Sequence, residues 1–263
     1  SGTTTITKGG ATPGHSGLPS AIEVVSGGTF THNSGTVLLS SAYDQDLEFD
    51  GTGNMYNLTV NKSDNDVIHN SNLTMEGNLD VTLASVHAFR PSAGSKTLTV
   101  SGNFEFNEGK FGAITPYTGA LSFGSLKVAG GEFNATSDTT TITGPANGDY
   151  LWRSNAATFH HNSGTVYITT GAYNGTDIYP ASTQHFYNLI LSGTGTVEMY
   201  SSKIANNYTL GTNVVFRPIT PTQAFTISGT ATMNGFFGKD GYPQTNVTNN
   251  NFGTLTINSG GTY

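Results

Sequence analysis

The sequence has no cysteine and few charged residues, and these shortages exclude several classes of protein. Without cysteine the chain forms neither a disulfide framework nor a thiolate metal site. Charged residues make up only 10% of the chain, and its ten Lys and Arg residues are scattered, which argues against nucleic-acid binding. No apolar run approaches the roughly 20 residues needed to cross a bilayer, so no membrane span is predicted.

The residues that are abundant indicate an all-β protein. The 263 residues include 34 glycines, and Val, Ile, Leu, Phe and Tyr occur in short alternating runs between Ser-Gly, Asn-Gly and Gly-Gly pairs. Such runs predict many short strands, each with one buried face. Strands are predicted, for example, at residues 36–39, 79–83, 97–100, 104–106 and 165–169. No window has the apolar periodicity of a helix, which argues against an α/β fold.

The chain repeats itself. Residues 29–37 read TFTHNSGTV and residues 158–166 read TFHHNSGTV, so the two strings differ only where Thr31 is replaced by His160. Further matches follow in the same order and with nearly the same spacing; one is the Phe-Arg-Pro string at residues 89–91 and 216–218. An ordered series of matches of this kind predicts a tandem repeat.

The repeat divides the chain into module one, residues 1–135, and module two, residues 136–263, the second continuous with the first. The chain ends Gly-Gly-Thr-Tyr and begins Ser-Gly-Thr-Thr-Thr-Ile, so joining its ends rebuilds the internal junction between the modules. We therefore expect either a slice of a longer array or head-to-tail stacking of separate molecules. Both termini are then expected to present open β edges, which invite another strand.

Two all-β architectures fit this pattern. A parallel β-solenoid, or β-helix, stacks coils of roughly 20–25 residues and places like residues in ladders along its axis. The alternative is two β-sandwich modules joined as beads. We favour the solenoid, because no Pro/Gly linker separates the modules and because a low charge suits ladders in which like charges would repel.

The repeated motif resembles that of a known group of proteins. The string Phe-x-His-Asn-Ser-Gly-Thr-Val, at residues 30–37 and 159–166, is followed by Tyr-Asn-Leu at residues 56–58 and 187–189, and residues 98–104 read LTVSGNF. This combination resembles the β-solenoid repeats of giant bacterial adhesin-like surface proteins and of phage tail-fibre-like virion proteins. The resemblance covers most of both modules. It implies an extended β architecture on a cell or virion surface, and it carries over no catalytic residue.

Three repeated motifs have a structural interpretation beside a functional one. The His-Asn-Ser-Gly strings at residues 32–35 and 161–164 suit a tight turn, and a ligand site with imidazole is the alternative. Asn57 and Asn188 are predicted to point inward and form hydrogen-bonded ladders between coils, with Tyr and Leu on the other strand face. Arg90 and its counterpart Arg217 are expected to pair with a local carboxylate or carbonyl group, and an anionic ligand is the alternative.

Four acidic residues alternate along one predicted strand: Asp44, Asp46, Glu48 and Asp50. Period-two spacing places them on one strand face. A solvated acidic face, a Ca²⁺ site and a pair of glycosidase carboxylates are the three possible interpretations. Counted along the repeat, the corresponding positions of module two hold no acid, so the fold is not expected to need these four. Those positions are Asn174, Thr176, Ile178 and Pro180.

Aromatic residues in variable loops are the predicted ligand contacts: Tyr117, Tyr150, Trp152 and Tyr242. An exposed aromatic ring on a rigid loop can stack on a sugar face or anchor a protein contact. The same rings could instead cover the edge of a solenoid. These residues therefore predict a surface that binds glycans or protein only if their side chains are exposed.

The leading functional hypothesis is a structural and adhesive repeat segment of an extracellular fibre or filament, on a cell or virion surface. Its expected partners are neighbouring repeats, further copies of the chain and surface glycans, and it is not expected to be an enzyme. No cofactor other than Ca²⁺ is considered. The alternative, from a different class, is a carbohydrate-binding or polysaccharide-degrading β-helix of the kind found on phage tail spikes.

Overall fold

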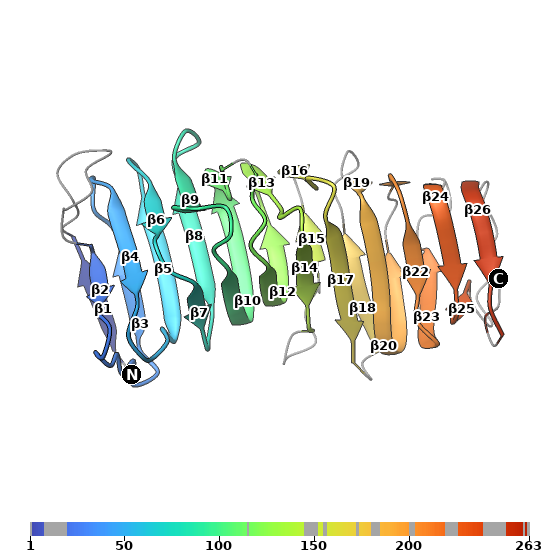
Figure 1. Cartoon of the computed structure of the whole chain (residues 1–263), viewed down its shortest axis with the longest axis horizontal. Helices are drawn as coiled ribbons and strands as arrows, with labels where there is room; N and C mark the ends of the chain where they lie inside the picture. Colours follow the sequence, from blue (N-terminus) through green and yellow to red (C-terminus); the bar gives the residue numbers. More distant parts are fainter. Residues whose placement is uncertain are drawn as a thin grey trace.

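The computed structural model describes residues 2–7, 20–114, 116–144, 152–154, 157–171, 174–179, 185–199, 203–218, 226–238, 251–259 and 261. Within these residues the chain forms strands β1 to β26 and no helix, and every pairing between strands is parallel. The strands stack along one long axis, with β1 and β26 at opposite ends (Figure 1). The chain is therefore a parallel β-solenoid, as predicted.

The strands line three faces, which the chain visits in turn, and five long strands bend from one face to the next. Face I contains β1 (Thr3–Ile6), β3 (Thr36–Leu39), β5 (Asn57–Lys62), β8 (Leu79–Leu83), the second parts of β10 (Leu98–Glu108) and β12 (Leu121–Val128), β15 (Trp152–Ser154), β18 (Asn174–Tyr179), the second part of β20 (Asn188–Met199), β23 (Asn213–Pro218) and β25 (Phe236–Phe237).

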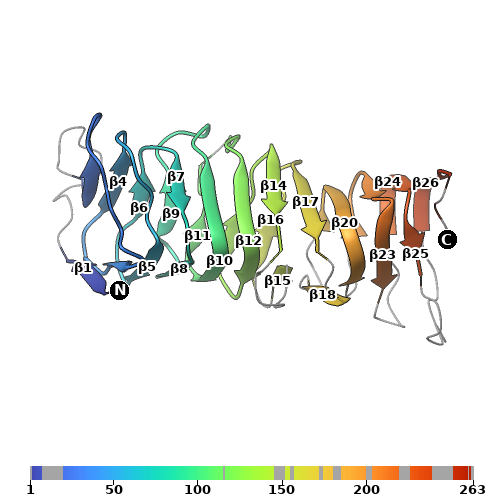
Figure 2. The ribbon, with the colours of Figure 1, turned by 90° about the horizontal axis from the view of Figure 1, so that it is seen from below.

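Face II contains β2 (Ile22–Val24), β4 (Gln45–Phe49), β6 (Val67–His69), β9 (Ala88–Pro91), β11 (Lys110–Phe111), β13 (Glu132–Asn134) and β16 (Thr158–His160), followed by β19 (His185–Phe186), β21 (Lys203–Ile204) and the first parts of β24 (Thr226–Met233) and β26 (Asn251–Ile257). Face III contains β7 (Leu73–Met75), the first parts of β10 and β12, β14 (Thr139–Ile142), β17 (Thr165–Thr170), the first part of β20, β22 (Tyr208–Leu210) and the second parts of β24 and β26. Figure 2 shows β10, β12, β14, β17 and β20 of this face side by side.

The coil passes from module one to module two without a seam. β12 of module one pairs directly with β14 and β15 of module two, and β13 pairs with β16. The register from one turn to the next sets Val37 beside Leu58 and Leu58 beside Leu79, so the length of a turn is close to the predicted one. The alternative of two separate β-sandwiches is wrong, because parallel strands pair across the module boundary.

The core is a continuous column of apolar side chains. Alternation along each strand sends every second residue inward, as in β8, where Leu79, Val81 and Leu83 are all buried. On face II the rings of Phe89, Phe111 and Phe133 stack in line, with centroids 6.2 and 4.5 Å apart. Stacking of like residues from turn to turn buries one side chain against the next, so each turn needs a neighbour to complete its core.

Asparagine ladders form at one corner, as predicted, but the expectation that they face inward is wrong, because Asn78 and Asn103 are exposed. The Asn57 Oδ1 atom accepts a hydrogen bond from the Asn78 amide, and the Asn78 Oδ1 atom accepts one from the Asn103 amide, at 2.8 and 2.9 Å. Glycine lies beside this ladder: a Cβ atom on Gly102 would come within 2.6 Å of the Gly77 carbonyl oxygen. The expected placement of Tyr beside Leu on one strand face is wrong, because Tyr56 precedes β5 at the corner, half-buried, while Leu58 is buried.

Equivalent strands of the two modules lie on different faces. Pairing along face I leads from β3 through β5, β8 and β10 to β12 and β15, which is five turns. β17 repeats the sequence of β3, yet it follows β15 and β16 and lies on face III. The repeat is thus two thirds of a turn longer than five turns, and module two is rotated by two faces relative to module one.

Candidate functional site

The two His-Asn-Ser-Gly strings form the same tight turn. Asn33 and Ser34 both have positive φ angles, 48° and 54°, and Asn162 and Ser163 have 48° and 61°. In each turn the glycine amide donates to the histidine carbonyl oxygen, and the serine amide donates to the histidine Nδ1 atom, at 2.8 to 2.9 Å. Two successive positive φ angles define a type I′ turn. The prediction of a turn is confirmed in both modules.

Each turn histidine also packs on the tyrosine that precedes the next coil. The rings of His32 and Tyr56 lie 5.4 Å apart, and those of His161 and Tyr187 lie 5.3 Å apart. The His32 Nε2 atom is 3.2 Å from the Glu76 Oε2 atom. These imidazole rings hold neighbouring turns together, and in the described residues they do not converge with a second histidine or with several acids.

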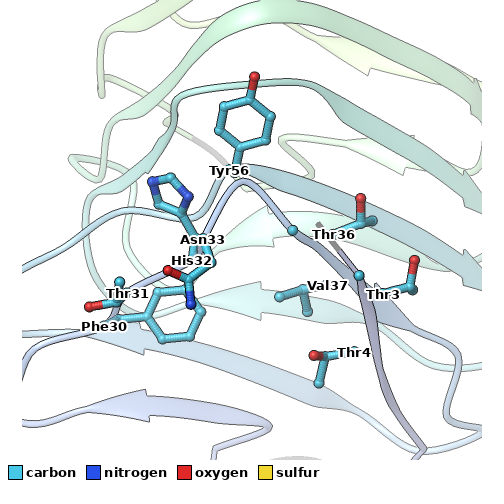
Figure 3. Close-up of a pocket in the computed structure, with 11 residues that line it drawn as sticks. Thr3, Thr4, Phe30, Thr31, His32, Asn33, Thr36, Val37 and Tyr56 are labelled. Carbon is cyan, nitrogen blue, oxygen red and sulfur yellow. The ribbon is translucent and has the colours of Figure 1, made fainter.

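The N-terminal end of the solenoid carries a pocket. Within the part of the chain that the structure describes, β1 pairs only with β3, and its first three residues are exposed. The pocket holds about 390 Å³ and is lined by Gly2, Thr3, Thr4, Phe30, Thr31, His32, Asn33, Gly35, Thr36, Val37 and Tyr56. Figure 3 shows Phe30 and Asn33 on one side of this space and Thr3, Thr4 and Val37 on the other.

The C-terminal end, formed by the last described strand, is apolar. Leu255 and Ile257 of β26 are 37% and 47% exposed. Their counterparts in module one, Leu126 and Val128, are 0% and 1% exposed, because β15 pairs over them. The last described strand therefore presents the side chains that the following coil covers at the module junction.

A network of charges surrounds the loop between β5 and β6. The Asp66 carboxylate accepts hydrogen bonds from the Arg90 Nε atom and from the Ala88 amide, both at 2.9 Å, and the His87 Nε2 atom lies 3.1 Å from the Asp64 Oδ1 atom. The Lys62 ammonium group is buried and donates to the Tyr43 carbonyl oxygen at 2.6 Å and to that of Asp66 at 3.1 Å. Burial lowers the pKa of Lys62 to about 8.

The predicted pairing of the Phe-Arg-Pro arginines is confirmed. Arg90 binds Asp66, as described above, and the Arg217 Nη1 atom lies 3.4 Å from the Glu198 Oε1 atom. Each arginine binds an acid on the preceding turn, so its positive charge is paired with a carboxylate of the same solenoid.

The four alternating acids are held by different partners. The Asp44 Oδ1 atom accepts from the Asp66 amide, and the Asp50 Oδ1 atom from the Ser71 hydroxyl, at 2.9 and 3.1 Å. Ser20 donates to the Glu48 carboxylate at 3.3 Å, and burial raises the pKa of Asp46. Throughout the described part of the chain, no three His, Asp or Glu side chains gather in a group that could hold a metal ion. The structure thus gives the Ca²⁺ hypothesis no geometric support.

The expected exposure of Tyr117 is wrong. Its side chain is 1% exposed and lies against Phe111, with ring centroids 6.4 Å apart. Burial raises the pKa of the Tyr117 hydroxyl, which has no hydrogen-bond partner among the described residues. An apolar core thus receives this ring, and no face of it is open to a sugar.

The other predicted aromatic contacts remain predictions. Tyr150 and Tyr242 lie outside the described residues. Trp152 begins β15 and pairs in register with Leu126 and Ile178, but its side chain is outside the described part. Of the four predicted aromatic contacts, only the Tyr117 side chain lies in the described part of the chain.

Sequence reasoning missed two features of this molecule. The network of charges around the loop between β5 and β6 joins Lys62, Asp66 and Arg90, which belong to two coils. No local sequence pattern predicts this network. The pocket joins Thr3 and Thr4 with Phe30 and Asn33, which are far apart in the sequence.

Comparisons with protein-family models, with curated proteins and with solved structures find no match for this chain. Within the residues described, no helix is long and apolar enough to cross a membrane. The class of protein rests on the fold alone, and that class is the parallel β-solenoid.

Proposed function

We propose that this chain is a structural and adhesive repeat segment of an extracellular surface fibre, in which modules continue one another end to end. It acts without catalysis, and its partners are neighbouring repeats or further copies of the chain. The resemblance of its repeat to bacterial adhesin-like and phage tail-fibre-like proteins supports a place on a cell or virion surface.

The observation that carries the proposal is the module junction compared with the last described strand. At the junction, β15 covers Leu126 and Val128 of β12. In β26, the equivalent Leu255 and Ile257 are exposed. An exposed apolar strand edge is a template for another strand, and the coil that fits it is already present in the repeat.

The mechanism is mechanical. Main-chain hydrogen bonds run parallel to the axis from turn to turn, so bending or shearing the rod breaks many bonds at once. Weak contacts made by each module add up through avidity when many modules are linked. Surface glycans stay among the proposed partners, through the side chains of Tyr150 and Tyr242.

The proposal is tested by measuring self-association of the whole chain. Sedimentation velocity over a wide concentration range and electron microscopy should show single rods giving way to longer rods of the same width. A Leu255→Asp/Ile257→Asp variant places two carboxylates on the docking edge, so it should remain single at concentrations where the parent assembles.

Val86→Asp is the matched control, because Val86 is 71% exposed but lies in a lateral turn and not on an end strand. It should assemble like the parent. Rods that stay single at every concentration, or equal assembly of the Leu255→Asp/Ile257→Asp variant, would count against end-to-end continuation.

A further inference from the structure

The outward residues of face III form a row that runs along the solenoid, and most of them carry a hydroxyl group. Each residue of this row pairs in register with the next, from β7 to β26, and the strands of its middle part lie side by side in Figure 2. The row, which we call the hydroxyl row, consists of Thr74, Thr99, Ser122, Thr141, Tyr167, Ile190, Thr209, Thr232 and Thr256. Leu98 and Val100, on either side of Thr99 in β10, are buried, so alternation turns the row toward solvent.

The hydroxyl groups of this row are free to bind an outside partner. Within the described residues, none of its seven Thr and Ser hydroxyls makes a hydrogen bond inside the chain, and all seven residues are half-buried or exposed. Neighbouring strands lie about 4.8 Å apart, so the row offers hydroxyls at that interval along the axis. The χ1 angle of threonine in a strand is stiff, so these groups lose little freedom when they bind a ligand.

Charged side chains are absent from the hydroxyl row but not from the outward rows of the other two faces. On face I, Asp80, Glu105 and Lys127 follow one another in register. On face II, Glu23 pairs with Glu48. A charged ligand would lose its hydration on the hydroxyl row without gaining an ion pair, so the row fits an uncharged partner. A second outward row, two residues earlier on the same strands, is also polar and uncharged at Thr139, Thr165, Asn188, Thr230 and Thr254.

An aromatic residue stands at the centre of the row. Tyr167 lies between Thr141 and Ile190 in register, and its side chain is half-buried on the outward side of β17. Within the described part of the chain, its ring has neither an aromatic nor a hydrogen-bond partner. Tyr167 and Ile190 thus give a short apolar surface with hydroxyl groups on both sides along the axis. An aromatic ring of this kind can stack on the apolar face of a sugar.

We propose that face III binds an extended, uncharged polysaccharide that lies along the hydroxyl row. Tyr167 stacks on the apolar face of one sugar ring, and the threonine hydroxyls on either side bond to the hydroxyl groups of neighbouring sugars. A β-linked chain such as that of cellulose or chitin is straight and can follow the row, whereas the coiled chain of starch cannot. The contacts of each turn are weak and add up along the row. The inference rests on the proposed adhesive function and names its ligand class, and it does not require rods to assemble.

Retention of the whole chain on insoluble polysaccharides tests this surface directly. The parent should be retained on cellulose or chitin, and it should pass through starch and through alginate, which is negatively charged. Tyr167→Ala should weaken retention about tenfold, because the stacking ring is lost. No retention of the parent on either cellulose or chitin overturns the assignment.

Two lysines placed in the row test its lack of charge. Thr141→Lys/Thr209→Lys should weaken retention by at least about tenfold, since each ammonium group gives up water without gaining a partner. The fold accepts lysine at an outward position, as Lys127 of face I shows. Thr59→Lys is the matched control, because Thr59 is an outward threonine of face I beside Asp80, and it should bind like the parent. Thermal melts check that every variant is folded.

Equal retention of the parent and of both face III variants, or equal retention on alginate, overturns the assignment. Inhibition of ice growth without retention on a polysaccharide also overturns it, because the row would then bind ice. The Leu255→Asp/Ile257→Asp variant separates this inference from the proposed function, since it should bind the polysaccharide as single rods. Rods that assemble in the parent but are not retained would refute the polysaccharide ligand while end-to-end assembly stands.

Discussion

The two modules turn the chain at one equivalent corner with different chemistry. In module one, β5 ends at Lys62, and a short loop containing Asn65, φ 60°, leads into β6. In module two, β20 runs through the equivalent corner, between faces III and I, without ending, because Gly193 and Gly195 adopt φ angles of 101° and 100°. Glycine reaches this region at low cost, whereas other residues do so only with strain.

The two modules also differ in the charged residues at this corner. Asp66 binds Arg90 and the Ala88 amide in module one. By strand register Thr196 replaces Asp66 in module two, and there the Nε atom of Arg217 is buried without a partner among the described residues. This corner therefore requires a change of chain direction and not a particular side chain. Module two makes the change with glycine, and module one makes it with a loop whose Asp66 carboxylate is bound by Arg90 and the Ala88 amide.

Breaking the glycine corner should have the largest effect. A Cβ atom at Gly193 would lie 2.1 Å from the Thr170 carbonyl oxygen, at a φ angle that a branched residue rarely adopts. We expect Gly193→Val to lower the free energy of unfolding by more than about 3 kcal/mol. Urea unfolding followed by circular dichroism measures this. Thr194→Val, at the exposed neighbouring position, should change it by less than about 0.5 kcal/mol. Equal effects of the two changes would contradict the role given to Gly193.

Acid should destabilise module one through His69, whose counterpart in module two is Met199. Burial lowers the pKa of His69 to about 4 from 6.5. As the pH falls below 6.5 the unfolded state takes up a proton that the folded state refuses, so stability is lost between pH 6.5 and 4. The loss is roughly 3 kcal/mol at pH 4. His69→Met should remove this part of the acid dependence, measured as the difference between the two proteins at each pH; parallel curves would refute it.

Removing the acid that holds each arginine should cost more in module one. Asp66→Ala leaves the Ala88 amide and Arg90 without their partner and should lower stability by about 2 kcal/mol. Glu198→Ala loses a single contact of 3.4 Å between half-exposed groups, which is worth less than about 1 kcal/mol. Denaturant titration of both variants gives the two values, and a reversed order would show that the loop does not depend on Asp66.

Raising the pH should produce the smallest effect, through Lys62. Its pKa is about 8 in the folded chain and 10.5 as the ordinary value, so between these values only the unfolded state keeps the proton. Stability therefore rises with pH in this window, by roughly 1 to 2 kcal/mol between about pH 8 and 9.5. Lys62→Met should lack this rise. Thermal melts of both proteins across the window measure it, and an identical slope would show that Lys62 is not the group responsible.

Much of the fold could be predicted from the sequence. The predicted strand at residues 36–39 is β3, and the predicted strands at residues 97–100 and 104–106 are two parts of β10. Several short strands of face II escaped notice, among them β6, β11 and β13. They are too short for alternation to be visible, and they form because the neighbouring turn offers them hydrogen bonds.

The candidate site was harder to predict, because its parts belong to different coils. The tight turns at residues 32–35 and 161–164 are local, so the residue types there were sufficient to predict a turn, although the positive φ angles fall on Asn and Ser and not on Asn and Gly. Alignment by the spacing of the repeat set Asp46 against Thr176. Strand register instead makes Asp177 the counterpart of Asp46, so the prediction that module two has no acid at these four positions is wrong.

By itself the sequence determined the all-β class, the two-module repeat and the presence of the tight turns, since alternation, repetition and turn preferences are properties of neighbouring residues. Only the tertiary structure decided that the repeat is two thirds of a turn longer than five turns, that Tyr117 is buried and that Phe30 and Asn33 border an open pocket. These depend on how many residues each coil uses to close, and that number is fixed by packing between turns.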